Sequence, residues 1–422
     1  MQNSGIEWIG EIPKEWTINS ISQLFSQVKN KNTDLQETNL LSLSYGKIKR
    51  KNIETTDGLL PESFDGYNIV ESNDIVLRLT DLQNDHKSLR VGLVTERGII
   101  TSAYLTIRNH SESIAKYLYF YLHAFDISKG FYGMGAGVRQ GLNWDGIKWL
   151  KILSPSIPEQ QAIADFLVTQ CAHIDSVIEK TRAAIEEYKK LKQSVITQAV
   201  TKGIRPNREM KDSGIEWIGE IPKEWAVQRI KTIFNLRDER NYLPLEEVNL
   251  ISLYTDKGVV QHSDLEKTTG NKASNADGYK IVCENDIIVN IILCWMGAIG
   301  RSDYQGVTSP AYDIYVPSNT IECRFYHHYF RTKGFSGDCY KRGKGIMAMR
   351  WRTYSDQFRD IKVVVPPLKE QQEILNYLDE KTAAIDSLIQ KKEQLISELE
   401  AYKKSLIYEY VTGKKEAPAH AH

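Results

Sequence analysis

The sequence has no long apolar run, and this absence excludes one class of protein at the outset. No stretch approaches the roughly 18–20 consecutive apolar residues that a helix needs to cross a bilayer, so we expect no membrane-spanning segment. The first residues, MQNSGIEWIG, have neither a basic start nor an apolar segment and do not resemble a signal peptide. These two absences predict a cytoplasmic protein.

Cysteine pairs and metal-ligand motifs are also scarce. The chain has five cysteines, an odd number, and no C-x-x-C pair, which argues against a disulfide framework and a zinc knuckle. We read them as reduced, mostly buried thiols. The nine histidines are scattered, with no H-E-x-x-H motif, so we predict no metal site and take His327 and His328 as core or surface residues.

Catalytic motifs are missing as well. The string GMGAGVRQG at 133–141 leads into what reads as a loop, and no P-loop pattern or Asn-Pro-Pro-aromatic string of an amino-methyltransferase occurs. Glu187, Tyr188 and Lys189 resemble a fragment of a nuclease motif, but they fall in a predicted long helix, where a solvated face is expected. We therefore expect no catalytic residue and no cofactor bound by this chain.

Neither sign of charge is in excess, since 54 basic residues balance 54 acidic ones. A neutral total weakens a nucleic-acid interpretation, because phosphate neutralisation drives non-specific affinity for DNA. The total hides local segregation, however. The segment CYKRGKGIMAMRWRTY at 339–354 is basic and contains no acidic residue. This local pattern favours a nucleic-acid surface.

What the sequence does contain is an internal repeat. The thirteen residues SGIEWIGEIPKEW occur at 4–16 and again, unchanged, at 213–225. Ordered matches follow at nearly the same offset, among them DGYNIVESNDIVLR (65–78) with DGYKIVCENDIIVN (277–290), and AHIDSVIEK (172–180) with AAIDSLIQK (383–391). The whole chain is therefore a tandem duplication, a pattern that decides the architecture before any single motif does.

Each copy has three parts: the opening segment just described, a body of short β-rich runs, and a long closing helix. The turn signals between the short runs predict a mixed α/β (α+β) globular body. We predict the first body at 1–157, a helix at 158–205, the second body at 206–367, a helix at 368–413 and a loose tail at 414–422. A helix starts well after Pro158, the first residue of PEQQAI (158–163), and after Pro367, just before KEQQEI (369–374).

The closing helices carry a heptad pattern in the same phase in both copies. A 3-4 spacing predicts a seam along which the two helices form an antiparallel coiled coil, with the bodies related by a pseudo-twofold axis. Thr181 and Lys392 are its polar interruptions. An alternative is an amphipathic helix that packs only on its own domain. The predicted packing residues are Ile174, Val177, Tyr188, Leu191, Ile385, Leu388, Leu395, Leu399 and Tyr402.

The opening segments bring two tryptophans each, Trp8 and Trp16 in the first copy and Trp217 and Trp225 in the second. Their large apolar area suits packing against the helical scaffold or a partner subunit. The alternative, that they close the core of their own domain, stays open.

Candidate DNA contacts lie at corresponding places in the two bodies. Arg, Gln and Asn can bind guanine or adenine edges in the major groove, and Lys can neutralise phosphates. The predicted contacts are Lys47, Lys49, Arg50, Arg78, Arg139, Gln140, Asn143, Lys257, Asn290, Lys341, Arg342, Lys344, Arg350 and Arg352. Trp351 and Tyr354 interleave the second cluster, where core packing is the competing role.

Together these motifs resemble the specificity subunit of type I restriction-modification enzymes. WIGEIPKEW opens each copy, a variable body follows, and an EQQ motif begins each long helix. The resemblance covers essentially the whole chain. It implies that each body is a target recognition domain for one half of a split double-stranded DNA site. It also implies that the helices are spacers and that the subunit itself is not an enzyme.

The resemblance implies partners as well. Two methyltransferase subunits would bind the helical region and use S-adenosylmethionine to methylate adenine, and restriction subunits, where present, would use ATP and Mg²⁺. Two rivals remain: a DNA-binding adaptor of a methylation-only system, and a tandem coiled-coil scaffold protein without DNA specificity. The basic glycine-rich segments speak against the scaffold.

Overall fold

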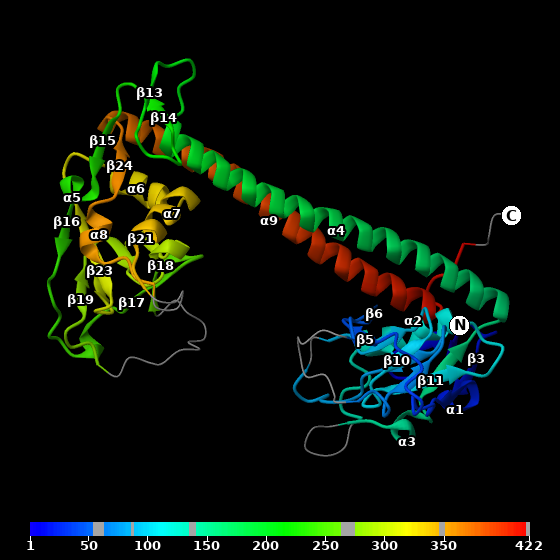
Figure 1. The fold of residues 1–422 in the computed structure, drawn as a ribbon. Coiled ribbons are helices and arrows are strands. Elements are labelled where there is room, and N and C mark those ends of the chain that lie inside the picture. Colours follow the sequence, from blue (N-terminus) through cyan, green and yellow to red (C-terminus); the bar gives the residue numbers. More distant parts are fainter. Residues whose placement is uncertain (54–62, 86–87, 135–140, 263–274, 346–350, 419–422) are drawn as a thin grey trace. The chain divides into compact units, whose positions relative to one another are not determined.

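The computed structural model describes residues 1–53, 63–85, 88–134, 141–262, 275–345 and 351–418 (Figure 1). The chain divides into two compact units. Unit 1 comprises Met1–Arg182 with Glu393–His422, and unit 2 comprises Ala183–Lys392. Each unit therefore contains one body and a part of each long helix.

Each body is built on a four-stranded antiparallel sheet with the same strand order. In unit 1 the order is β4 (Phe25–Gln27), β11 (Leu105–Asn109), β8 (Ile75–Leu77) and β9 (Val91–Leu93). In unit 2 it is β16 (Phe234–Arg237), β23 (Tyr312–Pro317), β20 (Ile287–Asn290) and β21 (Ile299–Arg301). The central strands β8 and β20 are apolar and buried, as strands covered on both faces must be.

Four two-stranded antiparallel pairs accompany each sheet. In unit 1 they are β1 (Gln2–Asn3) with β2 (Glu11–Ile12), β3 (Thr17–Ser20) with β12 (Lys151–Ser154), β5 (Leu41–Ser44) with β6 (Lys47–Arg50), and β7 (Asn68–Val70) with β10 (Gly98–Ile100). In unit 2 they are β13 (Met210–Asp212) with β14 (Glu220–Pro222), β15 (Ala226–Arg229) with β24 (Lys362–Val365), β17 (Ile251–Tyr254) with β18 (Gly258–Gln261), and β19 (Lys280–Val282) with β22 (Gly306–Thr308). The strand pairing thus repeats one for one.

The helices of the bodies repeat less closely. Unit 1 has α1 (Ile21–Leu24), α2 (Ala115–Ile127) and α3 (Trp144–Ile147). Unit 2 has α5 (Ile230–Ile233), the 3₁₀ helices η1 (Leu245–Glu247) and η3 (Cys294–Met296), and then α6 (Cys323–Phe330), α7 (Lys333–Arg342) and α8 (Ser355–Arg359). The single helix α2 corresponds to α6 and α7, which Thr332 separates by capping α7 through a bond from the Phe335 amide. Figure 1 shows α6, α7 and α8 lying beside the sheet of unit 2.

One glutamine of each EQQ motif joins the body to its long helix. Gln160 is 1% exposed, accepts a bond from the Ile114 amide at 2.9 Å and donates one to the Pro155 carbonyl at 2.9 Å. Gln371 is fully buried and repeats both bonds, with the Glu322 amide and the Pro366 carbonyl, each at 2.8 Å. The motif therefore joins the long helix to the start of α2 in unit 1 and to the start of α6 in unit 2.

The long helices are α4 (Ile157–Lys202) and α9 (Leu368–Val411), and both lie where the sequence predicts them. Within the described residues no helix is both long enough and apolar enough to cross a membrane. In each unit a part of α4 packs antiparallel against a part of α9. Lys403 contacts Asp175 in unit 1, and Lys192 contacts Asp386 in unit 2, each at 2.6 Å.

The phase of the predicted seam is wrong at every second position. Ile174, Tyr188, Ile385 and Leu399 do lie on the packed side. The other predicted residues lie one position away from it: Val177 at its edge, and Leu191, Leu388, Leu395 and Tyr402 at 49%, 42%, 41% and 54% exposure. The residues that pack instead are their C-terminal neighbours Ile178, Lys192, Ile389, Ile396 and Lys403.

Two lysines explain the error at two of the five misplaced positions. Leu191 and Tyr402 are apolar and stand beside Lys192 and Lys403, so the apolar member of each pair was assigned to the seam. In the structure the lysines occupy it, because Lys192 pairs with Asp386 and Lys403 with Asp175 across the helix pair. A partly buried charge is tolerated at such a position when an opposite charge contacts it.

The opening segments fold back onto the ends of the long helices. In unit 1 the Trp8 carbonyl accepts a bond from the Tyr408 hydroxyl at 3.1 Å, and Trp16 is 3% exposed. In unit 2 Lys202 donates to the Ile218 carbonyl at 2.7 Å, and Trp225 is fully buried. Both predicted roles of the tryptophans therefore apply within the chain: they close the core of their own unit, and they pack against a long helix in doing so.

Candidate DNA interface

A buried arginine organises the turn that follows β8 in unit 1. Arg90 has no exposed surface, and its guanidinium donates to four main-chain carbonyls, those of Arg78, Thr80, Asp81 and Asp85, at 2.6–3.3 Å. Its Nε donates to the Tyr132 hydroxyl at 3.2 Å, which ties the turn to the segment after α2. One side chain thus holds the main chain of residues 78–85 in place.

A different arginine does the same in unit 2. Arg331 lies just after α6 and donates to the carbonyls of Gly297 and Ile299 at 3.4 and 3.0 Å, and to those of Thr255 and Asp256 at 3.0 Å each. Burial lowers the pKa of this guanidinium from its ordinary value. Arg331 therefore joins the turn after β20 to the turn between β17 and β18.

The two turns present different side chains to solvent. In unit 1 the exposed residues of the turn are polar, namely Thr80, Gln83 and Asn84, and the apolar Leu79 and Leu82 point inward. In unit 2 the turn is shorter and shows Leu293 and Met296, at 37% and 54% exposure. The two units therefore have the same strand arrangement around the turn, but the exposed side chains of the turn differ.

Predicted cations gather around the turn of unit 2. Arg342 ends α7, Lys344 and Arg352 are bridged through their main chains at 2.8 and 3.0 Å, and Lys257 lies in the turn held by Arg331. Lys257, Arg342 and Lys344 are exposed, and none of them forms an ion pair with a residue that the structure describes. They are therefore available to an external anion.

Other predicted cations are engaged within the chain. Lys47 contacts Asp175 of α4 at 3.0 Å, Arg50 forms an ion pair with Glu96, and Arg78 lies 3.5 Å from Asp85. Lys341 contacts Glu216 of the opening segment at 2.6 Å. A DNA phosphate would have to compete with these carboxylates. Lys49 is exposed on β6 without an ion pair to a described residue.

Asn290 corrects the sequence prediction. Its side chain is 7% exposed, and its amide oxygen accepts bonds from the Ile292 and Leu293 main-chain amides at 3.0 and 3.2 Å. It shapes the turn from inside and has no edge free for a base. Asn143 is exposed but caps α3, where its side chain accepts from Gly146 at 3.1 Å. Arg139, Gln140 and Arg350 lie outside the described residues.

A buried carboxylate directly precedes the central strand β8 in unit 1 and β20 in unit 2. Asp74 is 1% exposed and pairs with Arg108 of β11 at 2.7 Å. Asp286 is also 1% exposed and pairs with Arg237 of β16 at 2.9 Å. Burial raises the pKa of Asp286, and the bond from the Cys283 amide and the Arg237 ion pair oppose that rise. Both units therefore have an aspartate at this position, and the arginine that pairs with it comes from β11 in unit 1 and from β16 in unit 2.

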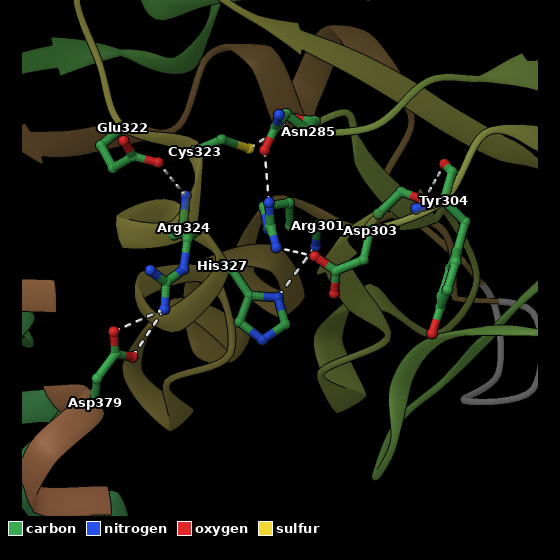
Figure 2. A network of polar contacts seen from close by, with 10 residues as sticks. Asn285, Arg301, Asp303, Tyr304, Glu322, Cys323, Arg324, His327 and Asp379 are labelled. Carbon is green, nitrogen blue, oxygen red and sulfur yellow. Dashed lines mark hydrogen bonds and ion pairs between the residues drawn. The ribbon is translucent and has the colours of Figure 1, made fainter. Parts of the chain in front are cut away.

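A polar network joins α6 to β21 and to α9 in unit 2 (Figure 2). The Arg301 amide donates to His327 Nδ1 at 3.1 Å, and its guanidinium donates to Asn285 at 2.6 Å. Arg324 pairs with both oxygens of Asp379 at 2.8 and 3.0 Å. Burial lowers the pKa of His327 to about 3, so this ring is neutral and serves as a hydrogen-bond acceptor in the core.

The described residues offer no cluster of three or more His, Cys, Asp or Glu side chains that could hold a metal ion. The five cysteines are free thiols, four of them buried. The candidate interface presents exposed cations, exposed amide, hydroxyl and apolar side chains, and turns whose main chain is held by arginine, and these groups suit recognition.

Sequence reasoning missed the residues that fix this surface. Arg90 and Arg331 do not occupy equivalent positions, so comparison of the two copies gives no signal for either. The roles of Gln160 and Gln371 could have been predicted from the sequence, because both lie in the repeated EQQ motif and buried polar residues are generally hydrogen-bonded.

Comparisons with known proteins give the chain a context. Residues 222–399 match the model of the type I restriction modification DNA specificity domain. The chain is 24% identical to the type I restriction enzyme MjaX specificity subunit of Methanocaldococcus jannaschii, over 96% of this chain and 95% of that protein. It is 21% identical to the MjaVIII specificity subunit of the same organism, over 96% of this chain and 93% of that protein.

Solved structures are similar in fold. A chain from a study of complex assembly and conformational transition of the type I restriction-modification system matches with a TM-score of 0.68 and 13% identity, over 96% of this chain and all of that one. The HsdS subunit from Thermoanaerobacter tengcongensis matches with a TM-score of 0.55 and 13% identity, over 98% of this chain and all of that one. At 13% identity these structures show that the fold is similar and show nothing further.

Proposed function

We propose that this chain, which belongs to the family of type I restriction-modification specificity subunits, reads a bipartite DNA site with one half assigned to each body. The observation that supports this most directly is the pairing of a repeated scaffold with two different displayed turns. A protein that reads one sequence twice would repeat the surface as well. Different side chains on the same frame suit an asymmetric pair of half-sites.

The exposed cations support DNA as the ligand. Arg342, Lys344 and Lys257 surround the turn of unit 2 without an internal counter-ion among the described residues. Such residues neutralise phosphates and position a reader, whereas the side chains of the turn would contact base edges. Binding should weaken steeply with added salt as counterions are released.

In this proposal the long helices set the gap between the half-sites. At about 1.5 Å per residue, the 46 residues of α4 extend on the order of 70 Å, which exceeds the 34–36 Å of one turn of B-DNA. Removal of seven residues from each helix at matched positions, 182–188 and 393–399, should shorten the accepted gap and leave both half-site sequences unchanged. An unchanged gap would exclude the spacer role.

The apolar side chains that lie off the seam suit the docking of methyltransferase subunits. Leu395 and Tyr402 are exposed in unit 1, and Leu191 and Leu388 in unit 2. Solvent-facing leucines on a helix are typical of a surface that a partner protein covers. The chain itself performs no chemistry in this proposal, and S-adenosylmethionine, ATP and Mg²⁺ belong to the partner subunits.

The test is a map of DNA methylation. The chain is expressed with its methyltransferase partner in a host that lacks adenine methylation, and modified adenines are read by single-molecule sequencing. We expect a split motif with a methylated adenine on each strand. The double variant Arg342→Gln, Lys344→Gln should lose that methylation, which would assign these cations to DNA. Lys341→Gln is the control, because Lys341 is already paired with Glu216.

A stable, S-adenosylmethionine-competent complex that methylates no motif would remove the DNA-reading proposal. The scaffold without DNA specificity would then be the better account.

A further inference from the structure

The turn after β20 places apolar side chains in a strongly cationic setting. Leu293 and Met296 are exposed, and Tyr340 and Tyr354 beside them are 48% and 46% exposed. Arg342, Lys344 and Arg352 lie on the adjoining segments of the same unit. Electrostatic attraction to the backbone of DNA does not explain the apolar groups beside these cations.

The turn is fixed by bonds on every side. Asn290 accepts from the Ile292 and Leu293 amides, the Thr353 amide donates to the Ile291 carbonyl at 2.9 Å, and the Ala298 amide donates to the Leu293 carbonyl at 3.1 Å. Gly297 closes the turn at a φ of +89°, a left-handed conformation that favours glycine. The exposed side chains are therefore presented on a rigid main chain.

An aromatic stack supports the turn from the side of α7. The Trp295 ring lies 5.6 Å from Tyr340, and Tyr340 stacks on Trp351 with centroids 4.9 Å apart and planes 20° apart. Trp351 also donates to the Tyr340 carbonyl at 3.1 Å. Trp295 thus anchors the turn, and Leu293 and Met296 on either side of it remain free to touch a ligand.

The chemistry of the major groove offers one apolar group, the C5 methyl of thymine. Two aliphatic side chains are too small an area for a stable protein interface, which needs on the order of 1,000 Å². They are a suitable size for one or two methyl groups, and the surrounding cations match the flanking phosphates. The exposed residues of unit 1, Thr80, Gln83 and Asn84, match the hydrogen-bonding edges of bases instead.

We infer that unit 2 reads its half-site partly through thymine methyl groups, which Leu293 and Met296 contact in the major groove. This inference rests on the proposed function and narrows it to a base type. It assigns specificity to residues that carry no charge and no hydrogen-bonding group.

The test replaces thymine by deoxyuridine, which lacks only the C5 methyl. Duplexes that carry the motif from methylation mapping are titrated with the complex of the full chain and its methyltransferase subunits at one fixed salt concentration. Deoxyuridine should weaken binding about three- to tenfold at one or two positions of a single half-site, as expected for the loss of an apolar methyl contact. Thymines of the other half-site should tolerate it.

The variants Leu293→Ala and Met296→Ala assign the effect to the turn. Each should weaken binding to the natural duplex by a similar factor, and the sensitive position should then no longer distinguish thymine from deoxyuridine. Met210→Ala is the matched control, because Met210 is a 37% exposed methionine on β13 of the same unit, outside this turn.

Each result bears on a different claim. Specific binding that is indifferent to deoxyuridine throughout both half-sites overturns the methyl contact and leaves the proposed function standing. An equal deoxyuridine penalty in wild type and in Met296→Ala and Leu293→Ala also overturns it. Absence of any specific binding removes the proposed function, and the inference with it.

Discussion

Units 1 and 2 repeat the same strands in the same order, but some of the contacts that hold them differ. Their opening segments are identical, yet Trp16 donates its indole N–H to Glu159 at 3.0 Å, whereas the buried N–H of Trp225 has no partner among the described residues. The other tryptophans show the reverse. Trp217 donates to Asp338 at 2.7 Å, and the N–H of Trp8 is buried without a partner.

The ion pairs of the buried carboxylates differ in the same manner. Arg108 neutralises Asp74 from β11, which lies next to β8, whereas Arg237 neutralises Asp286 from β16, which is separated from β20 by β23. Both copies retain the buried polar group that needs a bonding partner. The residue that acts as this partner differs between them. Buried polar groups impose such requirements because an unpaired one costs about 1–3 kcal/mol.

The largest effect on stability is expected when the arginine that holds each turn is replaced. Arg90→Met removes the arginine donor from four carbonyls and should destabilise the chain by about 3–5 kcal/mol in urea unfolding. Arg331→Met should cost less, about 2–3 kcal/mol, because Arg331 is partly exposed. Each variant should abolish recognition of one half-site only. Loss of the same half-site in both would contradict the division of labour.

Next in size is the acid at the start of each long helix. Glu370→Gln should cost about 2–4 kcal/mol, since it leaves Arg208, only 11% exposed, without its buried partner. Glu159→Gln should cost about 1 kcal/mol, because the amide oxygen can still accept from Trp16. Thermal unfolding of the two variants separates them, and equal shifts in Tm would show that the opening segments are fastened alike.

Acidification should affect unit 2 more than unit 1. Burial lowers the pKa of His327 to about 3 and that of His328 to about 4, and in unit 1 it lowers that of His123 to about 4. Their unfolded values lie near 6.5. Between pH 6.5 and 4 the unfolded chain therefore binds more protons, and stability that is complete above pH 6.5 is lost as the pH falls.

Each histidine should remove on the order of 1–2 kcal/mol by pH 5. Amide hydrogen exchange at pH 7 and pH 5, corrected for the intrinsic rate, resolves the two units. Peptides of unit 2 should lose more protection, and the His327→Gln, His328→Gln double variant should remove most of the difference.

The smallest expected effect concerns the seam of the long helices. Ile389→Ala and Ile396→Ala should each cost about 1–2 kcal/mol, whereas Leu388→Ala and Leu395→Ala should cost under about 0.5 kcal/mol. The same contrast in both units would establish the phase found here. In a pull-down, Leu395→Glu and Leu388→Glu should release the methyltransferase subunit, and retention would place its docking surface elsewhere.

The sequence predicts those features that repeat and misses those that depend on one pair of residues. Two heptad stretches in one phase were enough to locate α4 and α9, because amphipathic spacing acts over many residues. Every second seam residue is predicted one position away. At two of these positions the reason is that Lys192 and Lys403 look solvent-exposed until Asp386 and Asp175 are placed opposite them.

The candidate site was predictable to the same degree. The basic segment after α7 stands out by composition, and Arg342 and Lys344 are exposed there. Asn290 aligns with Arg78, and the alignment predicts a base contact, but in the structure its side-chain amide shapes the turn. A short polar side chain before a turn can bond the local main chain as readily as a ligand, and sequence alone does not separate the two.

The two arginines bind only main-chain oxygens in the turns that they hold. Every peptide unit supplies such an oxygen, whatever its side chain. Leu293 and Met296 can therefore mutate without loss of the arginine bonds that hold the turn on which they stand. Stability and specificity draw on different atoms of the same turn, so selection can change the DNA sequence that is read while the fold remains constant.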